Sequence, residues 1–98
     1  MAPTFDTTSH FDRQYRRLSI SEREAFKKAV HKFIQDLRLN QRTRKSLRIK
    51  GFQGERGIFE LTWADDGRAL FKFGDEIIPG EPHVIWLDIG GHEIFTKG

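Results

Sequence analysis

Apolar residues in the first part of the chain recur at helical spacing. Phe11, Tyr15 and Leu18 are separated by four and three residues, which places them on one side of a helix. We therefore predict a short helix over Ser9–Leu18, with Ser9 as its N-cap and Asp12 in the first turn, where a carboxylate complements the exposed amides. The stripe is interpreted as part of the core.

A longer and clearer helical pattern follows. Ser21 and Glu24 match the capping-box sequence and predict a helix from about Glu22 to Leu39. One face of this helix is expected to be buried, and it carries Phe26, Val30, Phe33, Ile34 and Leu37. The opposite face is expected to be solvated, and it carries Lys27, Lys28, Lys32, Gln35 and Asp36.

In the second half of the chain the period changes from helical to two, which is typical of strands. The first strand begins near Ile58, and Asp65-Asp66-Gly67 predicts a hairpin turn after it. The returning strand is expected to point Ala69, Phe71 and Phe73 inward and Arg68, Leu70 and Lys72 outward. The segment His83–Ile89 predicts the most apolar and therefore central strand, and Trp86 could face either side of it.

Together with a short edge strand over Pro3–Thr8, these elements predict a single α+β domain over residues 1–98. The expected order is strand, helix, helix and three further strands. Two N-terminal helices would pack on one face of a small, mainly antiparallel four-stranded sheet. The other face, bordered by the basic segment before Lys50, would then form a shallow surface on which we expect the function to lie.

Composition and charge add information on the compartment and the partners of the protein. The chain has 98 residues, a net charge of +3 and no cysteine, which fits a cytoplasmic protein and excludes disulfides and thiolate sites. No membrane span or secretion signal is expected. Six cations occur between Asp36 and Glu55 with no acid among them: Arg38, Arg42, Arg44, Lys45, Arg48 and Lys50. This segment indicates either a polyanion-binding surface or simply a solvated basic loop.

The chemistry-bearing residues are mainly cations. The four histidines lack the spacing of a metal site, and no phosphate-binding loop is present, so no metal or other cofactor is expected. Cations can neutralise the charge that builds on a phosphoryl group when a ribose 2′-hydroxyl attacks it, and a histidine can transfer the proton. The candidates for such RNA cleavage are Lys45, Arg48, Lys50, Arg68, Lys72, His92 and Phe95.

Three segments in order resemble a known family. They are FELTWADDGRALF from Phe59 to Phe71, HVIWLDIGGHEIF from His83 to Phe95, and LRIKG from Leu47 to Gly51. Together they resemble the RelE-like toxins of bacterial toxin–antitoxin systems, members of the RelE/ParE superfamily. The resemblance implies a cytoplasmic toxin that is neutralised by a cognate antitoxin, in a possible toxin–antitoxin hetero-oligomer, and that cuts mRNA in the ribosomal A site without a metal.

The resemblance also implies roles for single residues. Arg68 matches the strand arginine that stabilises the scissile phosphate, and Lys50 and His92 are the other expected catalytic residues. The expected RNA-binding residues are Lys45, Arg48, Lys72 and Phe95. Arg68 also has a structural interpretation, as an exposed strand cation paired with Glu60 across the hairpin.

The sequence departs from the family pattern near its end. Phe95 stands where many members carry a tyrosine, so it can stack on a base but cannot transfer a proton, and Asp88 and Glu93 add negative charge. Two alternatives therefore stay open: a ParE-like toxin that poisons DNA gyrase, and a non-catalytic module that binds nucleic acid or an antitoxin.

Overall fold

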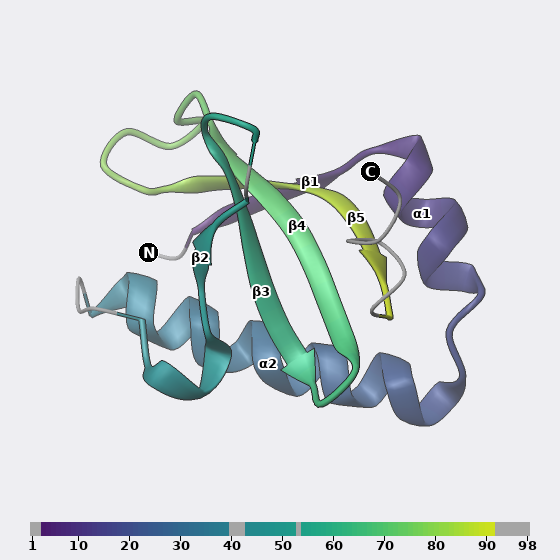
Figure 1. The fold of residues 1–98 in the computed structure, drawn as a ribbon. Coiled ribbons are helices and arrows are strands. Elements are labelled where there is room, and N and C mark those ends of the chain that lie inside the picture. Colours follow the sequence, from purple (N-terminus) through teal and green to yellow (C-terminus); the bar gives the residue numbers. More distant parts are fainter. Residues whose placement is uncertain (1–2, 40–42, 53, 92–98) are drawn as a thin grey trace.

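The computed structural model describes residues 3–39, 43–52 and 54–91 and shows two layers, helices against one sheet (Figure 1). The helical layer consists of α1 (Ser9–Arg16) and α2 (Ile20–Arg38). The short helical turn η1 (Lys45–Leu47) leads into the sheet. The strands are β1 (Thr4–Thr7), β2 (Lys50–Gly51), β3 (Ile58–Ala64), β4 (Gly67–Gly74) and β5 (His83–Gly90).

The strands form one sheet in the order β1-β5-β4-β3-β2, in which only β1 and β5 are parallel. The predicted α+β class, with two helices on a mainly antiparallel sheet, is confirmed. The predicted number of four strands is wrong, because β2 adds a fifth. β2 has two residues, Lys50 and Gly51, which pair with Glu60 and Phe59. A strand this short carries no periodicity by which a sequence pattern could reveal it.

The N-caps of both helices lie before the residues predicted for them. Thr8, not Ser9, caps α1, because its side-chain oxygen accepts a hydrogen bond of 3.1 Å from the Phe11 amide. The capping box of α2 is formed by Ser19 and Glu22, not by Ser21 and Glu24. The S-x-x-E pattern occurs at both places, two residues apart, so the pattern alone does not select one of them.

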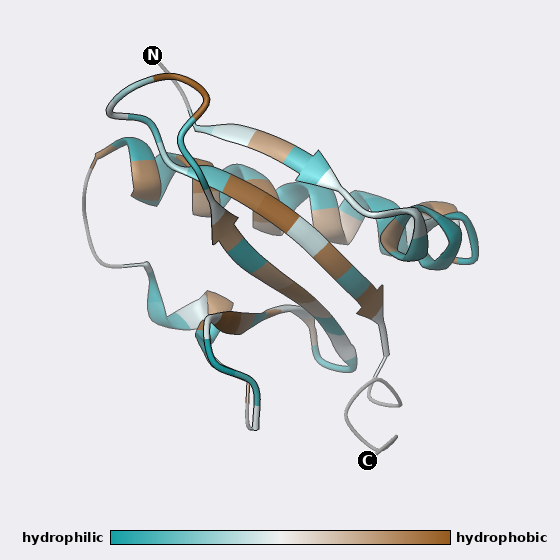
Figure 2. Cartoon of the chain, turned by 90° about the horizontal axis from the view of Figure 1, so that it is seen from above, coloured by the Kyte–Doolittle hydropathy of each residue, from teal (hydrophilic) through white to brown (hydrophobic). Residues whose placement is uncertain are grey.

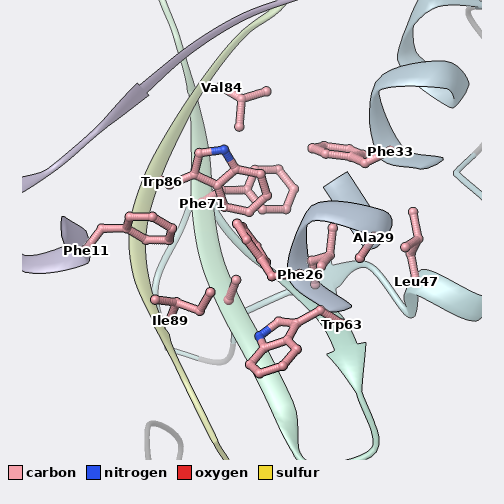
Figure 3. Close-up of a cluster of buried hydrophobic side chains, with 12 residues drawn as sticks. Phe11, Phe26, Ala29, Phe33, Leu47, Trp63, Phe71, Val84, Trp86 and Ile89 are labelled. Carbon is pink, nitrogen blue, oxygen red and sulfur yellow. The ribbon is translucent and has the colours of Figure 1, made fainter. Parts of the chain in front are cut away.

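The core lies between α2 and the central strands and is rich in aromatic rings (Figure 3). The ring centres of Phe33 and Phe71 are 5.0 Å apart, and those of Phe26 and Trp86 are 5.2 Å apart. Trp86 is 3% exposed and therefore belongs to the core, not to the outer face. Figure 2 shows hydrophobic residues concentrated along β4 and β5, whereas α1 is largely hydrophilic.

Phe73 and Asp36 differ from their predicted environment, and Leu70, predicted to point outward, is only 9% exposed. Phe73 was expected to point into the core but is 46% exposed, because it lies near the end of β4 and touches Phe59 and Phe71 only at the margin of the core. Asp36 was expected on the solvated face of α2 but is 5% exposed. A buried carboxylate needs a partner, and Arg44 provides one.

Candidate functional site

The sheet face away from the helices carries a polar cleft of about 300 Å³. It is lined by Arg48, Ile49, Lys50, Glu60, Thr62 and Arg68. Strand pairing explains why these residues meet, because Lys50 lies opposite Glu60 in the β2–β3 pair and Thr62 lies opposite Arg68 in the β3–β4 pair. The cleft thus brings together three of the predicted site residues, Arg48, Lys50 and Arg68.

Arg68 is held at the hairpin turn by backbone oxygens. Its Nη1 donates to the carbonyls of Ala64 at 3.2 Å, Asp65 at 3.3 Å and Gly67 at 3.0 Å. These contacts fix the guanidinium beside the cleft and stabilise the turn at the same time. The interpretation of Arg68 as the partner of Glu60 is wrong, because the Glu60 carboxylate pairs with Lys50 instead.

Lys50 and Glu60 form the ion pair of the cleft. The distance between Lys50 Nζ and Glu60 Oε1 is 3.4 Å, with the lysine side chain 71% exposed and the glutamate side chain 10% exposed. The lysine reduces the penalty of keeping a carboxylate at a buried position. The sequence analysis named Glu60 only as a partner of Arg68 and not as a residue of the cleft, because its partner strand β2 was not predicted.

Arg48 reaches the cleft from an unusual backbone conformation. It follows η1 with a φ of 48° and a ψ of 43°, the left-handed region. It is the one residue other than glycine with positive φ in the part of the chain that the structure describes. This region disfavours a residue with a Cβ by about 1–2 kcal/mol, and glycine or asparagine usually occupies it after a helix.

The basic segment that carries Arg48 and Lys50 is fastened to α2 by Asp36 and Arg44. The Asp36 carboxylate accepts hydrogen bonds from the Arg44 amide at 2.9 Å, from Nε at 3.1 Å and from Nη2 at 2.8 Å. The hydrogen bonds from the Arg44 side chain hold the pKa of Asp36 below its usual value of 3.8, and burial opposes them. The same contact raises the pKa of Arg44.

Two further predicted site residues, Lys45 and Lys72, do not line this cleft. Lys45 is exposed on η1. Lys72 follows Arg68 by four residues on the same face of β4, about 13 Å along the strand at about 3.3 Å per residue. It lies between Ile58 and Ile85 in the strand pairing. His92 and Phe95 lie outside the described residues.

The negative charge of Asp88 was expected to disfavour RNA binding, but this carboxylate lies next to His10. His10 Nε2 lies 3.1 Å from Asp88 Oδ1. His83 is buried and hydrogen-bonds through Nδ1 to the Thr4 hydroxyl at 2.7 Å. Within residues 3–39, 43–52 and 54–91, no three His, Asp or Glu side chains gather as a metal site would require, and no helix is long and apolar enough to cross a membrane.

Comparison with known proteins finds similar structures but no similar sequence family. No family model matches the chain, and no curated protein sequence matches it. A chain of the E. coli DinJ–YafQ toxin–antitoxin complex superposes with a TM-score of 0.66 at 11% identity, over 96% of this chain and 97% of that one. The E. coli RelBE toxin–antitoxin complex gives 0.60 at 18% identity, over 92% and 96%. The YoeB/ParE toxin from Agrobacterium tumefaciens gives 0.65 at 10% identity, over 91% and 98%.

Proposed function

The chain has the fold of RelE-like toxins, and we propose that it is the toxin of a toxin–antitoxin system, acting as an endoribonuclease that cleaves mRNA on the ribosome. The observation that carries this proposal is the meeting of Arg48, Lys50 and Arg68 around one cleft. If the basic segment were only a solvated loop, its cations would not be expected to lie beside Arg68 on β4.

The cleft suits the chemistry of RNA cleavage. When a ribose 2′-hydroxyl attacks the adjacent phosphate, negative charge builds on the phosphoryl oxygens, and fixed cations stabilise it. In the proposed mechanism Arg68 serves this role, since its guanidinium is already held by three carbonyls and loses little freedom on binding. Because the nucleophile belongs to the RNA itself, we propose a reaction that needs no metal.

Two proton transfers complete the proposed reaction, one from the 2′-hydroxyl and one to the leaving 5′-oxygen. Lys50 and the Glu60 carboxylate beside it are the candidates within the cleft. His92 is proposed as the second proton carrier. Lys45 and Lys72 are proposed to contact RNA outside the cleft and Arg48 within it. Phe95 is proposed to stack on a base.

The proposed partners follow from the toxin function. They are a cognate antitoxin, which would form a hetero-oligomer with this chain in the cytoplasm, and mRNA in the ribosomal A site. An acidic segment of the antitoxin would be complementary to the basic cleft and would block it.

The test is induced expression of the wild type and of Arg68→Ala in bacteria, with growth followed and mRNA 5′ ends mapped within minutes. We expect arrest and new in-frame cuts with the wild type and neither with the variant. Because Arg68 also stabilises the hairpin turn, Lys50→Ala is a second variant that leaves the turn intact. Arg13→Ala, an exposed arginine on α1, is the matched control.

The outcomes separate the proposed function from its alternatives. Equal cutting by folded Arg68→Ala and Lys50→Ala proteins would remove the cleft from the mechanism. Arrest with intact mRNA and gyrase-dependent DNA breaks would indicate a ParE-like toxin. RNA or antitoxin binding without arrest would indicate a non-catalytic module.

A further inference from the structure

A second cleft, of about 490 Å³, lies beside the first between α2, η1 and the end of β3. Arg48 and Thr62 line both clefts, so the two adjoin at these residues. Lys28 and Lys32 form its α2 wall, and Asp65 at the hairpin turn is its acidic residue. The sequence pattern assigned both lysines only to the solvated face of α2.

The charge of the second cleft favours an anion. Three cations, Lys28, Lys32 and Arg48, face one carboxylate. Lys28 and Lys32 are four residues apart on α2, which puts them on the same side of the helix, about 6 Å apart along its axis. Neither lysine forms an ion pair with any residue that the structure describes, whereas their neighbour Lys27 pairs with Glu24 at 3.5 Å.

The wall of the cleft formed by β3 is an uncovered strand edge. β2 pairs only with Phe59 and Glu60, so β3 from Thr62 onward has no strand beside it on that edge within the described segments. The path from the first cleft to the second is therefore not closed by a further strand. Trp63 lines the second cleft but is 9% exposed, which leaves little ring surface on which a base could stack.

We infer that the second cleft is a phosphate-binding subsite for single-stranded RNA, which runs from the first cleft past Arg48 to Lys28 and Lys32. This inference rests on the proposed function and adds a second place where the same strand is held. Cations without an accessible aromatic face recognise the backbone and not the bases. The subsite therefore contributes affinity without sequence preference.

The test measures the salt dependence of RNA binding by fluorescence anisotropy, with 2′-O-methyl RNA that cannot be cleaved. Lys28→Gln/Lys32→Gln is compared with the wild type and with Arg13→Gln/Lys27→Gln, which removes the same charge from exposed positions outside the cleft. A strand of about four nucleotides is expected to fill only the first cleft, and one of about twelve to reach the second. Thermal unfolding checks that each variant is folded.

Each phosphate contact with a single strand contributes about 0.7 to the slope of log affinity against log salt concentration. Removing two contacts should make this slope less steep by about 1.4 for the longer RNA. Between about 50 and 200 mM salt, the affinity of the wild type should therefore fall about sevenfold more than that of the double variant. The shorter RNA should show no difference, and the control variant should behave as the wild type.

Equal slopes for wild type and double variant with the longer RNA would overturn the subsite, and RNA cleavage that depends on Arg68 would show that the proposed function survives this failure. If the wild type binds neither RNA, the subsite is overturned, whereas the proposed function is then decided by mRNA cleavage on the ribosome. If an oligoglutamate peptide binds through Lys28 and Lys32 while RNA does not, the second cleft receives an acidic protein partner, and the inference is wrong.

Discussion

Replacing Arg48 with glycine should make the protein more stable and less active. The left-handed backbone at Arg48 costs about 1–2 kcal/mol for a residue with a Cβ, and glycine removes this strain. Glycine also gives the unfolded chain more freedom, which costs about 0.5–1 kcal/mol. The free energy of unfolding should therefore rise by about 0.5–1 kcal/mol, and the melting temperature by about 2–8 °C for a domain of this size.

The assay pairs thermal unfolding with mRNA cleavage. Arg48→Ala is the matched control, because it keeps the strain while removing the guanidinium, so its melting temperature should stay near that of the wild type while cleavage falls as in the glycine variant. Arg48→Lys should retain part of the activity. A glycine variant that melts below the wild type would refute the assignment of strain, and full cleavage by both the glycine and the alanine variants would refute the role of the side chain.

Three further predictions concern the supports of the fold. The pKa of Asp36 is lowered in the folded state, so its charge stabilises the fold above the usual value of 3.8, and this stabilisation is lost as pH falls through the folded pKa. Asp36→Asn should therefore lower the free energy of unfolding at pH 7 and lower it less near pH 3, as measured by urea unfolding. Gly67→Ala should lower stability by about 1–3 kcal/mol in thermal unfolding. The added Cβ would lie 2.6 Å from Trp63 Cζ2 and closer still to Cε2, so unchanged stability would contradict the packing. Thr8→Ala should cost about 1 kcal/mol and Ser9→Ala almost nothing, and the reverse order would mean that the cap is misassigned.

The sequence pattern predicts most of the fold because the core residues follow the period of their elements. Phe26 and Phe33 on α2, and Ala69 and Phe71 on β4, lie in the core as expected. Element boundaries are less determined, since neighbouring residues such as Thr8 and Ser9 can both cap a helix. The sequence does not predict β2, because its two residues are recognised as a strand only by their pairing with β3.

The candidate site is predicted in part for the same reason. Alternation along β4 places Arg68 and Lys72 on the outer face, but it does not say which cations from the basic segment will reach Arg68. That choice depends on the fold of the segment after α2, where the turn at η1 directs Arg48 and Lys50 to the cleft and leaves Lys45 exposed. Such a turn depends on contacts between distant residues, and a single sequence does not display them.

Three residues that depart from locally favoured environments lie on or against the basic segment. Asp36 is a buried carboxylate, Arg48 is a non-glycine residue in the left-handed region, and Glu60 is a buried carboxylate on a strand. Each is explained by the basic segment: Arg44 pairs with Asp36, Arg48 belongs to it, and Lys50 pairs with Glu60. Departures from locally favoured structure are expected where function, not stability, selects the residue. Arg48 and Glu60 line the cleft beside Arg68, and Asp36 holds the segment that carries Arg48. These departures therefore point to the same cleft as the convergence of Arg48, Lys50 and Arg68 does.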